Sequence, residues 1–391
     1  MNPQLKAQLD GSLMPTYGRF PVALVSGQGA VATDDTGKTY IDFGSGIGVN
    51  ALGYCDNGWL QAVMAQAATL QHISNLYYSP VQAELAAALC RATGMDKAFL
   101  CNSGAEANEC AIKLARKYSF DTYGAGRSTI VGMKNSFHGR TITTLAATGQ
   151  DSFHQNFFPF TEGFVFAEAG RLDDLLTLLD DSVCAVLLEC IQGEGGVIPL
   201  PADYLQAVRR LCTERDILLL VDEVQTGAGR TGKFLACEHA GILPDVVTMA
   251  KGIGGGLPIG ACLSAPAFAN VLSAGTHGST FGGNPVACAG ARYMVERLSD
   301  PALLAEVERK GLLVRRRLEA MPHVKEVRGL GLMLGVVLDK GAAREVAESC
   351  LEGGLLILTA KTLLRLLPPL NITDAELTAG LDILEETLRA L

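Results

Sequence analysis

A stretch near the middle of the sequence, beginning with the letters ILLLVDEVQ, constrains the fold most strongly. It contains two short apolar runs, Ile217–Val221 and Val246–Met249. Their length and branched side chains are typical of buried β-strands. The first run leads to Asp222 and Glu223, and the second leads to Lys251 in a glycine-rich loop. Ligands of open α/β sheets bind beyond the carboxyl ends of the strands, so these polar residues are candidates for a site.

A lysine and an aspartate at two strand ends suit pyridoxal phosphate (PLP). The lysine forms a Schiff base with this cofactor, and the acid keeps the pyridine nitrogen protonated so that the ring accepts electrons. Two other motifs fit less well. Gly227–Lys233 resembles a nucleotide-binding P-loop, but Phe234 follows it where a magnesium-binding hydroxyl belongs, and GIGGG after the lysine lacks the dinucleotide-binding spacing. Taken singly, each charged residue is also compatible with a solvated strand end.

Further strand-like runs alternate with helical patterns and predict an α/β fold. They occupy Ala98–Cys101, Thr129–Met133 and Val183–Leu188. Such alternation favours a mostly parallel sheet with helices on both faces. We expect three regions: an N-terminal arm with short strands that join the small domain (1–55), a large cofactor-binding domain (56–290) and a smaller C-terminal α+β domain (291–391).

Several loops carry candidate ligand-binding groups. In NSGAEANE, Ser103 is a natural helix N-cap, and the backbone N–H groups of Ser103, Gly104 and Ala105 form a phosphate cradle at the positive helix end. In NSFHGR, Phe137 can stack on an aromatic ring, and Arg140 can hold a carboxylate through its guanidinium fork. Ordinary capping and ordinary surface exposure remain open for these residues on sequence alone.

Composition excludes several classes of function. The 391 residues carry a net charge of −9, with no basic cluster beyond Arg315–Arg317, so no nucleic-acid partner is expected. Eleven cysteines occur without a C-x-x-C pair, which suits a reducing cytoplasm. The N-terminus has no apolar signal region, and no apolar run approaches the ~18 residues of a membrane span, so we expect no membrane association.

These motifs together resemble the class III PLP-dependent aminotransferases of fold type I, most closely the acetylornithine/ornithine aminotransferase branch. The resemblance covers essentially the whole chain. It rests on YIDFGSGIGVNALG, NSGAEANE, FHGR, ECIQGEGG, LLLVDEVQTGAGRTGKF, MAKGIGGGLPIGA, GSTFGGNP, VRGLGLMLGV and LRLLPPL, which occur in the family's order. It implies PLP as the cofactor and no metal ion.

The resemblance also implies a set of cofactor contacts. Lys251 carries the cofactor, Asp222 pairs with its pyridinium nitrogen, and Gln225 reaches its phenolic oxygen. The remaining positions are Val224 and Phe137 on the two ring faces, Ser103, Gly104 and Ala105 at the phosphate, Glu223 beside the aspartate, and Thr280, which arrives from the partner subunit.

The implied substrate contacts come from both domains. Arg140 binds the substrate carboxylate, Tyr17 contacts the substrate, and Ser279 of the partner subunit lies at the mouth of the site. Glu194, assigned a catalytic role with Lys251 and Asp222, masks Arg365 until a substrate carboxylate displaces it. The shared contacts imply an obligatory homodimer with shared active sites.

Three residues depart from the family pattern. The family usually has LGH-x-HP where this chain has LGYCDN, so Tyr54 and Asn57 replace histidine and proline. This loop lies near the site entrance in relatives, so we expect the change to affect substrate preference. Cys190 stands where proline is common.

The implied reaction transfers the terminal amino group of N2-acetyl-L-ornithine to 2-oxoglutarate. It yields N-acetylglutamate 5-semialdehyde and glutamate, in arginine biosynthesis, by ping-pong kinetics. Ornithine, 4-aminobutyrate, N-succinyl-diaminopimelate and acetyl-lysine remain alternative donors. An aminomutase is disfavoured by Arg365, and a non-catalytic scaffold by the complete set of chemical residues.

Overall fold

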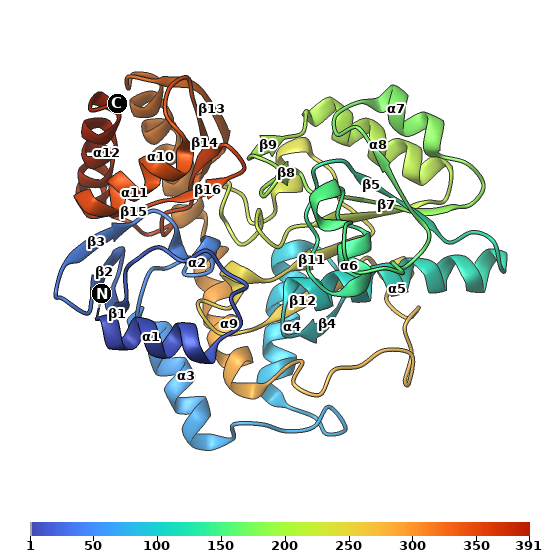
Figure 1. The fold of residues 1–391 in the computed structure, drawn as a ribbon. Helices are drawn as coiled ribbons and strands as arrows, with labels where there is room; N and C mark the ends of the chain where they lie inside the picture. Colours follow the sequence, from blue (N-terminus) through green and yellow to red (C-terminus); the bar gives the residue numbers. More distant parts are fainter. Residues whose placement is uncertain (1) are drawn as a thin grey trace.

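The computed structural model describes residues 2–391 and is organised around a mostly parallel sheet (Figure 1). Within these residues the sheet has seven strands. Their spatial order is β4 (Lys97–Cys101), β12 (Gly260–Ser264), β11 (Val246–Met249), β10 (Leu218–Asp222), β7 (Val183–Leu188), β5 (Thr129–Met133) and β6 (Phe164–Ala167). Strand β12 runs antiparallel to its neighbours, and the other pairs are parallel. The carboxyl ends of the parallel strands therefore lie along one edge.

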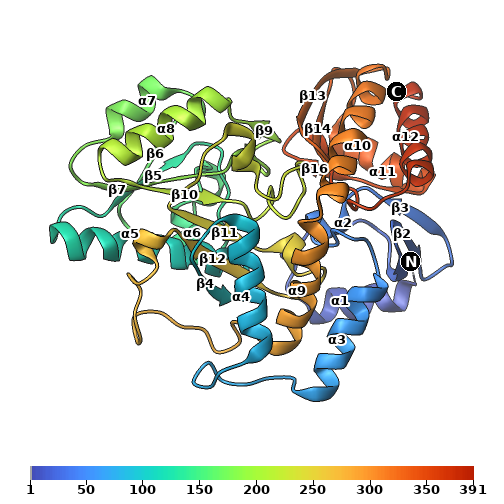
Figure 2. The same cartoon turned by 180° about the vertical axis from the view of Figure 1, so that it is seen from behind.

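Helices cover both faces of this sheet, as the two views in Figures 1 and 2 show. The helix α5 packs on one face, and α7 and α8 pack on the other. The helices of the first 300 residues are α1 (Pro3–Ser12), α3 (Asn57–Thr69), α4 (Pro80–Thr93), α5 (Gly104–Tyr123), α6 (Ile142–Ala146), α7 (Leu172–Leu178), α8 (Ala202–Glu214) and α9 (Pro285–Leu298).

The central strand β10 explains why the chain needs a continuous apolar run. Its side chains alternate between the two faces. Leu219 and Val221 join the core on the α8 side, whereas Leu218 and Leu220 join the core on the α5 side. A strand that is buried on both faces must be apolar at every position. Strand β10 can therefore deliver its first polar side chain, Asp222, only at its carboxyl end.

The C-terminal residues form a second unit beside the large one, coloured orange to red in Figure 1. Its antiparallel sheet has the order β13 (Val324–Leu330), β14 (Met333–Leu338), β17 (Leu363–Leu366) and β16 (Leu358–Ala360). Its helices are α10 (Pro301–Glu319), α11 (Ala343–Gly353) and α12 (Asp374–Arg389). Among residues 2–391, no helix combines the length and apolar character needed to cross a membrane.

The N-terminal strands attach to this second unit. A separate sheet has the order β1 (Leu24–Gln28), β2 (Val31–Asp34), β3 (Thr39–Asp42) and β15 (Leu355–Leu356). The pairing of β15 with β3 is parallel and joins segments more than 300 residues apart. The division into three regions, with its boundaries, stays a prediction.

A left-handed turn, α2 (Ser45–Gly48), follows β3. Its four residues have φ angles of 48°, 60°, 65° and 75°. Two of them, Ser45 and Ile47, are not glycine, and left-handed backbone is costly for such residues. The turn is held by Asp42, whose carboxylate accepts the backbone N–H of Gly44 at 2.7 Å and of Ser45 at 2.9 Å.

The strands predicted for the large sheet agree with the structure to within about one residue, but other elements differ. The N-terminal arm, expected to be extended with short strands, begins with the helix α1, which has no buried residue and hence no apolar face to reveal it. The helix that begins after Ser103 runs from Gly104 to Tyr123, one residue before Gly124. Strand β6 was not predicted.

We predict that Leu219→Ala lowers the free energy of unfolding by about 2 to 5 kcal/mol, because Leu219 is fully buried in β10 and truncation leaves a cavity. Urea denaturation at one fixed protein concentration measures the change. The exposed Leu176 of α7 provides the control, with an expected effect of Leu176→Ala within about 0.5 kcal/mol. Equal losses in both variants would contradict this account of the core.

Candidate functional site

A cavity of about 620 Å³ opens at the carboxyl edge of the large sheet. Strand β10 brings Asp222 to it, and the segment after β11 brings Lys251. Ten of the predicted site residues line this cavity: Tyr17, Ser103, Gly104, Ala105, Phe137, Arg140, Asp222, Val224, Gln225 and Lys251. Residues from four separate motifs, together with Tyr17, are thus gathered in one place by the fold.

The carboxylate of Asp222 is buried and fully engaged. One oxygen accepts from Asn108 Nδ2 at 2.7 Å and lies 2.8 Å from His138 Nδ1, and the other accepts from the Val224 N–H at 2.9 Å. Asn108 is itself fixed, because its amide donates to the His138 carbonyl and accepts from Thr248. These bonds keep the carboxylate at a defined position.

Asn108 and His138 belong to the NSGAEANE and FHGR motifs, but the sequence did not predict either of them as a site residue. Asn108 is the seventh letter of NSGAEANE, and His138 is the second letter of FHGR. Polar residues within a helix or a loop that become fully buried must find partners. The available signal was a polar residue on the apolar face of a helix, where Asn108 lies among buried alanines.

The start of α5 forms the other end of the cavity. Ser103 caps the helix, since its hydroxyl accepts from the Glu106 N–H at 3.2 Å. The first N–H groups of a helix have no intrahelical acceptor and lie at its positive end, so this end suits a phosphate. Gly104 is required here, because a Cβ atom at this position would lie 2.7 Å from Val224.

Burial shifts the pKa values of two ionisable groups in the cavity, Lys251 and Glu189. Burial lowers the pKa of the Lys251 amine, although Glu194 and Asp222 act in the opposite direction. Burial also raises the pKa of Glu189 to about 7. The Glu189 carboxylate accepts from the N–H groups of Phe137 at 3.0 Å and Gly193 at 3.2 Å. A lysine with a lowered pKa is better able to act as a base near neutral pH.

Glu194 and Arg365 meet at the junction of the two units. Arg365 Nη1 lies 2.5 Å from Glu194 Oε1 and 3.2 Å from Gln225 Oε1. Arg365 is 3% exposed, whereas Glu194 is 29% exposed. Burial acts to raise the pKa of Glu194, but the charge and hydrogen bond of Arg365 hold it below its ordinary value. Neither residue lines the cavity directly, and Gln225 connects them to it.

Other predicted residues lie elsewhere. Glu223 is turned away from the cavity: its carboxylate accepts from Thr226 and, at 2.8 Å, from the Cys237 N–H. The prediction that it contacts the cofactor is corrected accordingly, because adjacent residues at a strand end point to opposite sides. Ser279 and Thr280 line a different cavity, on the outer surface.

The remaining substrate residues lie at the rim. Tyr17 is 75% exposed, and Arg140 is exposed above the Phe153 ring, with its guanidinium carbon 4.1 Å from the ring centroid. The altered loop does not line this cavity. Asn57 is the exposed first residue of α3, where proline is favoured, and Tyr54 lines a separate cavity. The expected effect of this loop on substrate preference stays a prediction.

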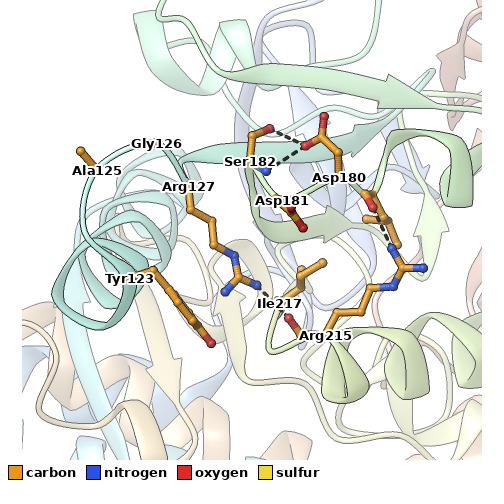
Figure 3. Close-up of a pocket in the computed structure, with 10 residues that line it drawn as sticks. Tyr123, Ala125, Gly126, Arg127, Asp180, Asp181, Ser182, Arg215 and Ile217 are labelled. Atoms are coloured by element: carbon orange, nitrogen blue, oxygen red, sulfur yellow. Dashed lines mark hydrogen bonds between the residues drawn. The ribbon is translucent and has the colours of Figure 1, made fainter.

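A second cavity, of about 830 Å³, lies at the opposite edge of the sheet (Figure 3). It is formed by the segments that precede β5, β7 and β10. Arg127 donates to the carbonyls of Val183 and Arg215, and Arg215 donates to that of Leu179. These guanidinium groups are engaged by backbone carbonyls at the strand starts, which is a structural role.

We predict that Glu189→Gln changes the pH dependence of stability. Between the ordinary carboxyl pKa of 4.5 and the raised value of about 7, the folded protein keeps a proton that the unfolded chain releases. The contribution of Glu189 to stability therefore falls as the pH rises through this range. The free energy of unfolding of the variant, relative to the parent, should rise by about 1 to 3 kcal/mol from pH 5 to pH 8.

Urea denaturation at several pH values, at constant cofactor and protein concentration, measures this difference. Glu214→Gln, at an exposed position, is the control and should follow the parent across the range. A difference between Glu189→Gln and parent that is independent of pH would contradict the assignment.

Comparison with known proteins shows the family of the chain. The family described as Aminotransferase class-III matches residues 13–388. An acetylornithine aminotransferase from Haemophilus ducreyi is 53% identical over 384 residues, which cover 97% of this chain and 98% of that protein.

Solved structures agree in fold. An N-acetylornithine aminotransferase from Stenotrophomonas maltophilia has a TM-score of 0.84 and 39% identity, covering 96% of this chain and 97% of its own. An ornithine aminotransferase from Toxoplasma gondii, with PLP at partial occupancy in its active site, has a TM-score of 0.95 and 33% identity, covering 100% and 95%. The predicted fold type and cofactor are confirmed, and the chain belongs to the class-III aminotransferase family.

Proposed function

We propose that this protein transfers the terminal amino group of N2-acetyl-L-ornithine to 2-oxoglutarate. The observation that carries the proposal is the Glu194–Arg365 pair beside the Lys251 cavity. An arginine that can bind a substrate carboxylate, and that is paired with a glutamate when no such carboxylate is present, suits a site that must accept two different amino donors. The similarity to acetylornithine aminotransferases supports this donor. Ornithine, 4-aminobutyrate, N-succinyl-diaminopimelate and acetyl-lysine are the alternatives.

The residues in the cavity fit PLP. The start of α5 suits its phosphate, Gly104 leaves room for Val224 to lie under a flat ring, and Asp222 supplies an anion for the ring nitrogen. When bound, PLP supplies an electron sink for negative charge that develops at the carbon next to the reacting amine.

The protein's own residues have distinct tasks in this proposal. Asp222, held by Asn108 and His138, keeps a proton on the ring nitrogen. Lys251 Nζ, with its lowered pKa, moves a proton from the substrate carbon. Arg140 at the rim binds a distal carboxylate of the substrate.

Glu194 sets the choice between the two donors. Glutamate presents an α-carboxylate beside its reacting amine, and this group can displace Glu194 from Arg365. N-acetylornithine presents only a methylene there, so Glu194 must stay in place, because a buried charge without a partner is costly.

A homodimer completes the site in this proposal. Leu76, Tyr77, Tyr78 and Phe281 are exposed side chains, and most of them border the outer cavity that contains Ser279 and Thr280. A contiguous exposed apolar surface of this kind favours a protein partner, here a second copy of the chain. We further propose a cytoplasmic location, which the free state of all eleven cysteines supports, and a role in arginine biosynthesis.

A steady-state panel of the five candidate amines with 2-oxoglutarate tests the function. N-acetylornithine should give the highest kcat/KM. A higher value for any other amine would replace the proposed donor, and no turnover with any of them would reject the reaction.

We predict that borohydride treatment of the PLP-loaded protein attaches a reduced pyridoxyl group to Lys251, as peptide mapping would show. Lys251→Ala should lose this label and lower turnover by about a thousandfold or more, while the protein stays folded. Lys233→Ala, at an exposed lysine nearby, should keep both label and activity. A label on another lysine in the parent protein would overturn the assignment.

We predict that Glu194→Ala affects the two half-reactions unequally. The N-acetylornithine half-reaction should slow by about tenfold or more, since a charge-assisted hydrogen bond contributes ~1.5 to 3 kcal/mol. The glutamate half-reaction should persist or become faster. Single-turnover absorbance changes of the cofactor measure each rate.

The matched control is Glu326→Ala, which breaks the exposed Glu326–Arg328 pair in the small unit and should leave both half-reactions unchanged. Equal losses in both half-reactions of Glu194→Ala would mean that Glu194 positions the cofactor and does not act as a switch.

A further inference from the structure

Tyr54, one of the departures from the family pattern, is tightly packed and hydrogen-bonded by its neighbours. Its backbone exchanges two hydrogen bonds with Gly29, at 2.8 and 2.9 Å. Its ring lies so close to β1 that a Cβ atom at Gly27 would be 2.6 Å from it. Gly53 has a φ of +75°, and a Cβ atom there would lie 2.4 Å from the Gly29 carbonyl oxygen. Glycines at 27 and 53 are therefore needed to seat this tyrosine.

The hydroxyl of Tyr54 forms a hydrogen bond with the carboxylate of Asp42. It donates to Asp42 Oδ2 at 2.7 Å. The other oxygen of Asp42 caps the turn α2 by accepting from Gly44 and Ser45. Both side chains lie at one end of an otherwise apolar cavity of about 220 Å³. In such surroundings a hydrogen bond is stronger than in water, so Tyr54 fixes the carboxylate that holds the turn.

The turn α2 in turn contacts the loop that carries Lys251. A Cβ atom on Gly252 would lie 3.6 Å from the Gly48 carbonyl oxygen and 3.6 Å from Ala51. Val49, between these residues, lines the Lys251 cavity. A shift of the turn would therefore move Val49 in the cavity wall directly. It would affect Lys251 through the adjacent Gly252.

We propose that Tyr54 is a positioning residue for amino-donor binding: through Asp42 it holds the left-handed turn against the lysine loop, so that Val49 forms a fixed wall of the cavity. The proposal rests on the proposed transamination, and it specifies how a residue outside the site influences substrate preference. Tyr54 touches neither the cavity nor its contents, so its effect passes entirely through the turn.

The chain offers a close control on the same sheet. The Tyr40 hydroxyl donates to Asp34 Oδ2 at 2.8 Å, and Asp34 Oδ1 caps the turn that follows β2 by accepting from Thr36 and Lys38. This tyrosine–aspartate pair has the same construction but no contact with the Lys251 cavity. Tyr54→Phe and Tyr40→Phe each remove one oxygen atom and keep the ring.

Hydrogen exchange of the PLP-loaded protein gives the first readout. Tyr54→Phe should speed exchange in the peptide covering residues 43–51 by about threefold to tenfold, the equivalent of one hydrogen bond. Tyr40→Phe should leave that peptide unchanged. A cooperative thermal unfolding transition in each variant would show that both are folded.

Steady-state kinetics give the second readout. Tyr54→Phe should raise KM for the amino donor by about threefold to tenfold while kcat stays within about twofold and PLP content is unchanged. Unchanged exchange in residues 43–51, or the same KM change in Tyr40→Phe, would overturn the proposal. Should the parent prefer an amine other than N-acetylornithine, the proposed donor fails, whereas the exchange comparison and the KM comparison on the preferred amine still decide the role of Tyr54.

Discussion

The need to surround one buried carboxylate with hydrogen-bond donors organises the site. Asp222 is 4% exposed, and an anion so placed is costly unless donors surround it. Its donors come from different parts of the chain: Asn108 from α5, His138 from the loop after β5, and Val224 from the end of β10. Because Asn108 also accepts from Thr248 of β11, the network ties together the elements that carry the phosphate cradle and the lysine. The site is therefore held rigid before any ligand arrives.

A second constraint joins the two units. Arg365 comes from β17 of the small unit, and it is buried against Glu194 and Gln225 of the large one. A buried guanidinium needs acceptors, and Glu194 and Gln225 supply them to Arg365 across the boundary between the units. The contact between the units therefore depends in part on this buried ion pair.

The sequence was informative wherever burial on both faces leaves few residue types. The bounds of β5, β7 and β11 follow directly from apolar runs, and Ser103 was identifiable as a cap. Contacts between distant segments were not predictable: His138 and Asp222 are 84 residues apart, and only the folded sheet brings them together. Nor can a pattern decide which of two adjacent acids faces a cavity. Asp222 and Glu223 occupy consecutive positions and point to opposite sides, so the register of β10 makes the choice.

The loops around the site carry backbone strain that the sheet sustains. Lys251 has a φ of 47°, and Asn135, Val197 and Ala228, all in loops at the same edge, have φ angles of 66°, 50° and 56°. Each such residue is unfavourable by about 1 to 3 kcal/mol and persists only where its surroundings over-determine it. Ala228 illustrates the support, because its Cβ lies 3.2 Å from the Cβ position of Gly252, directly beside the lysine. A larger residue at position 252 would press these two strained turns apart. The small residues between the turns are therefore part of the site, since they set how closely the turn at Ala228 packs against the loop that carries Lys251.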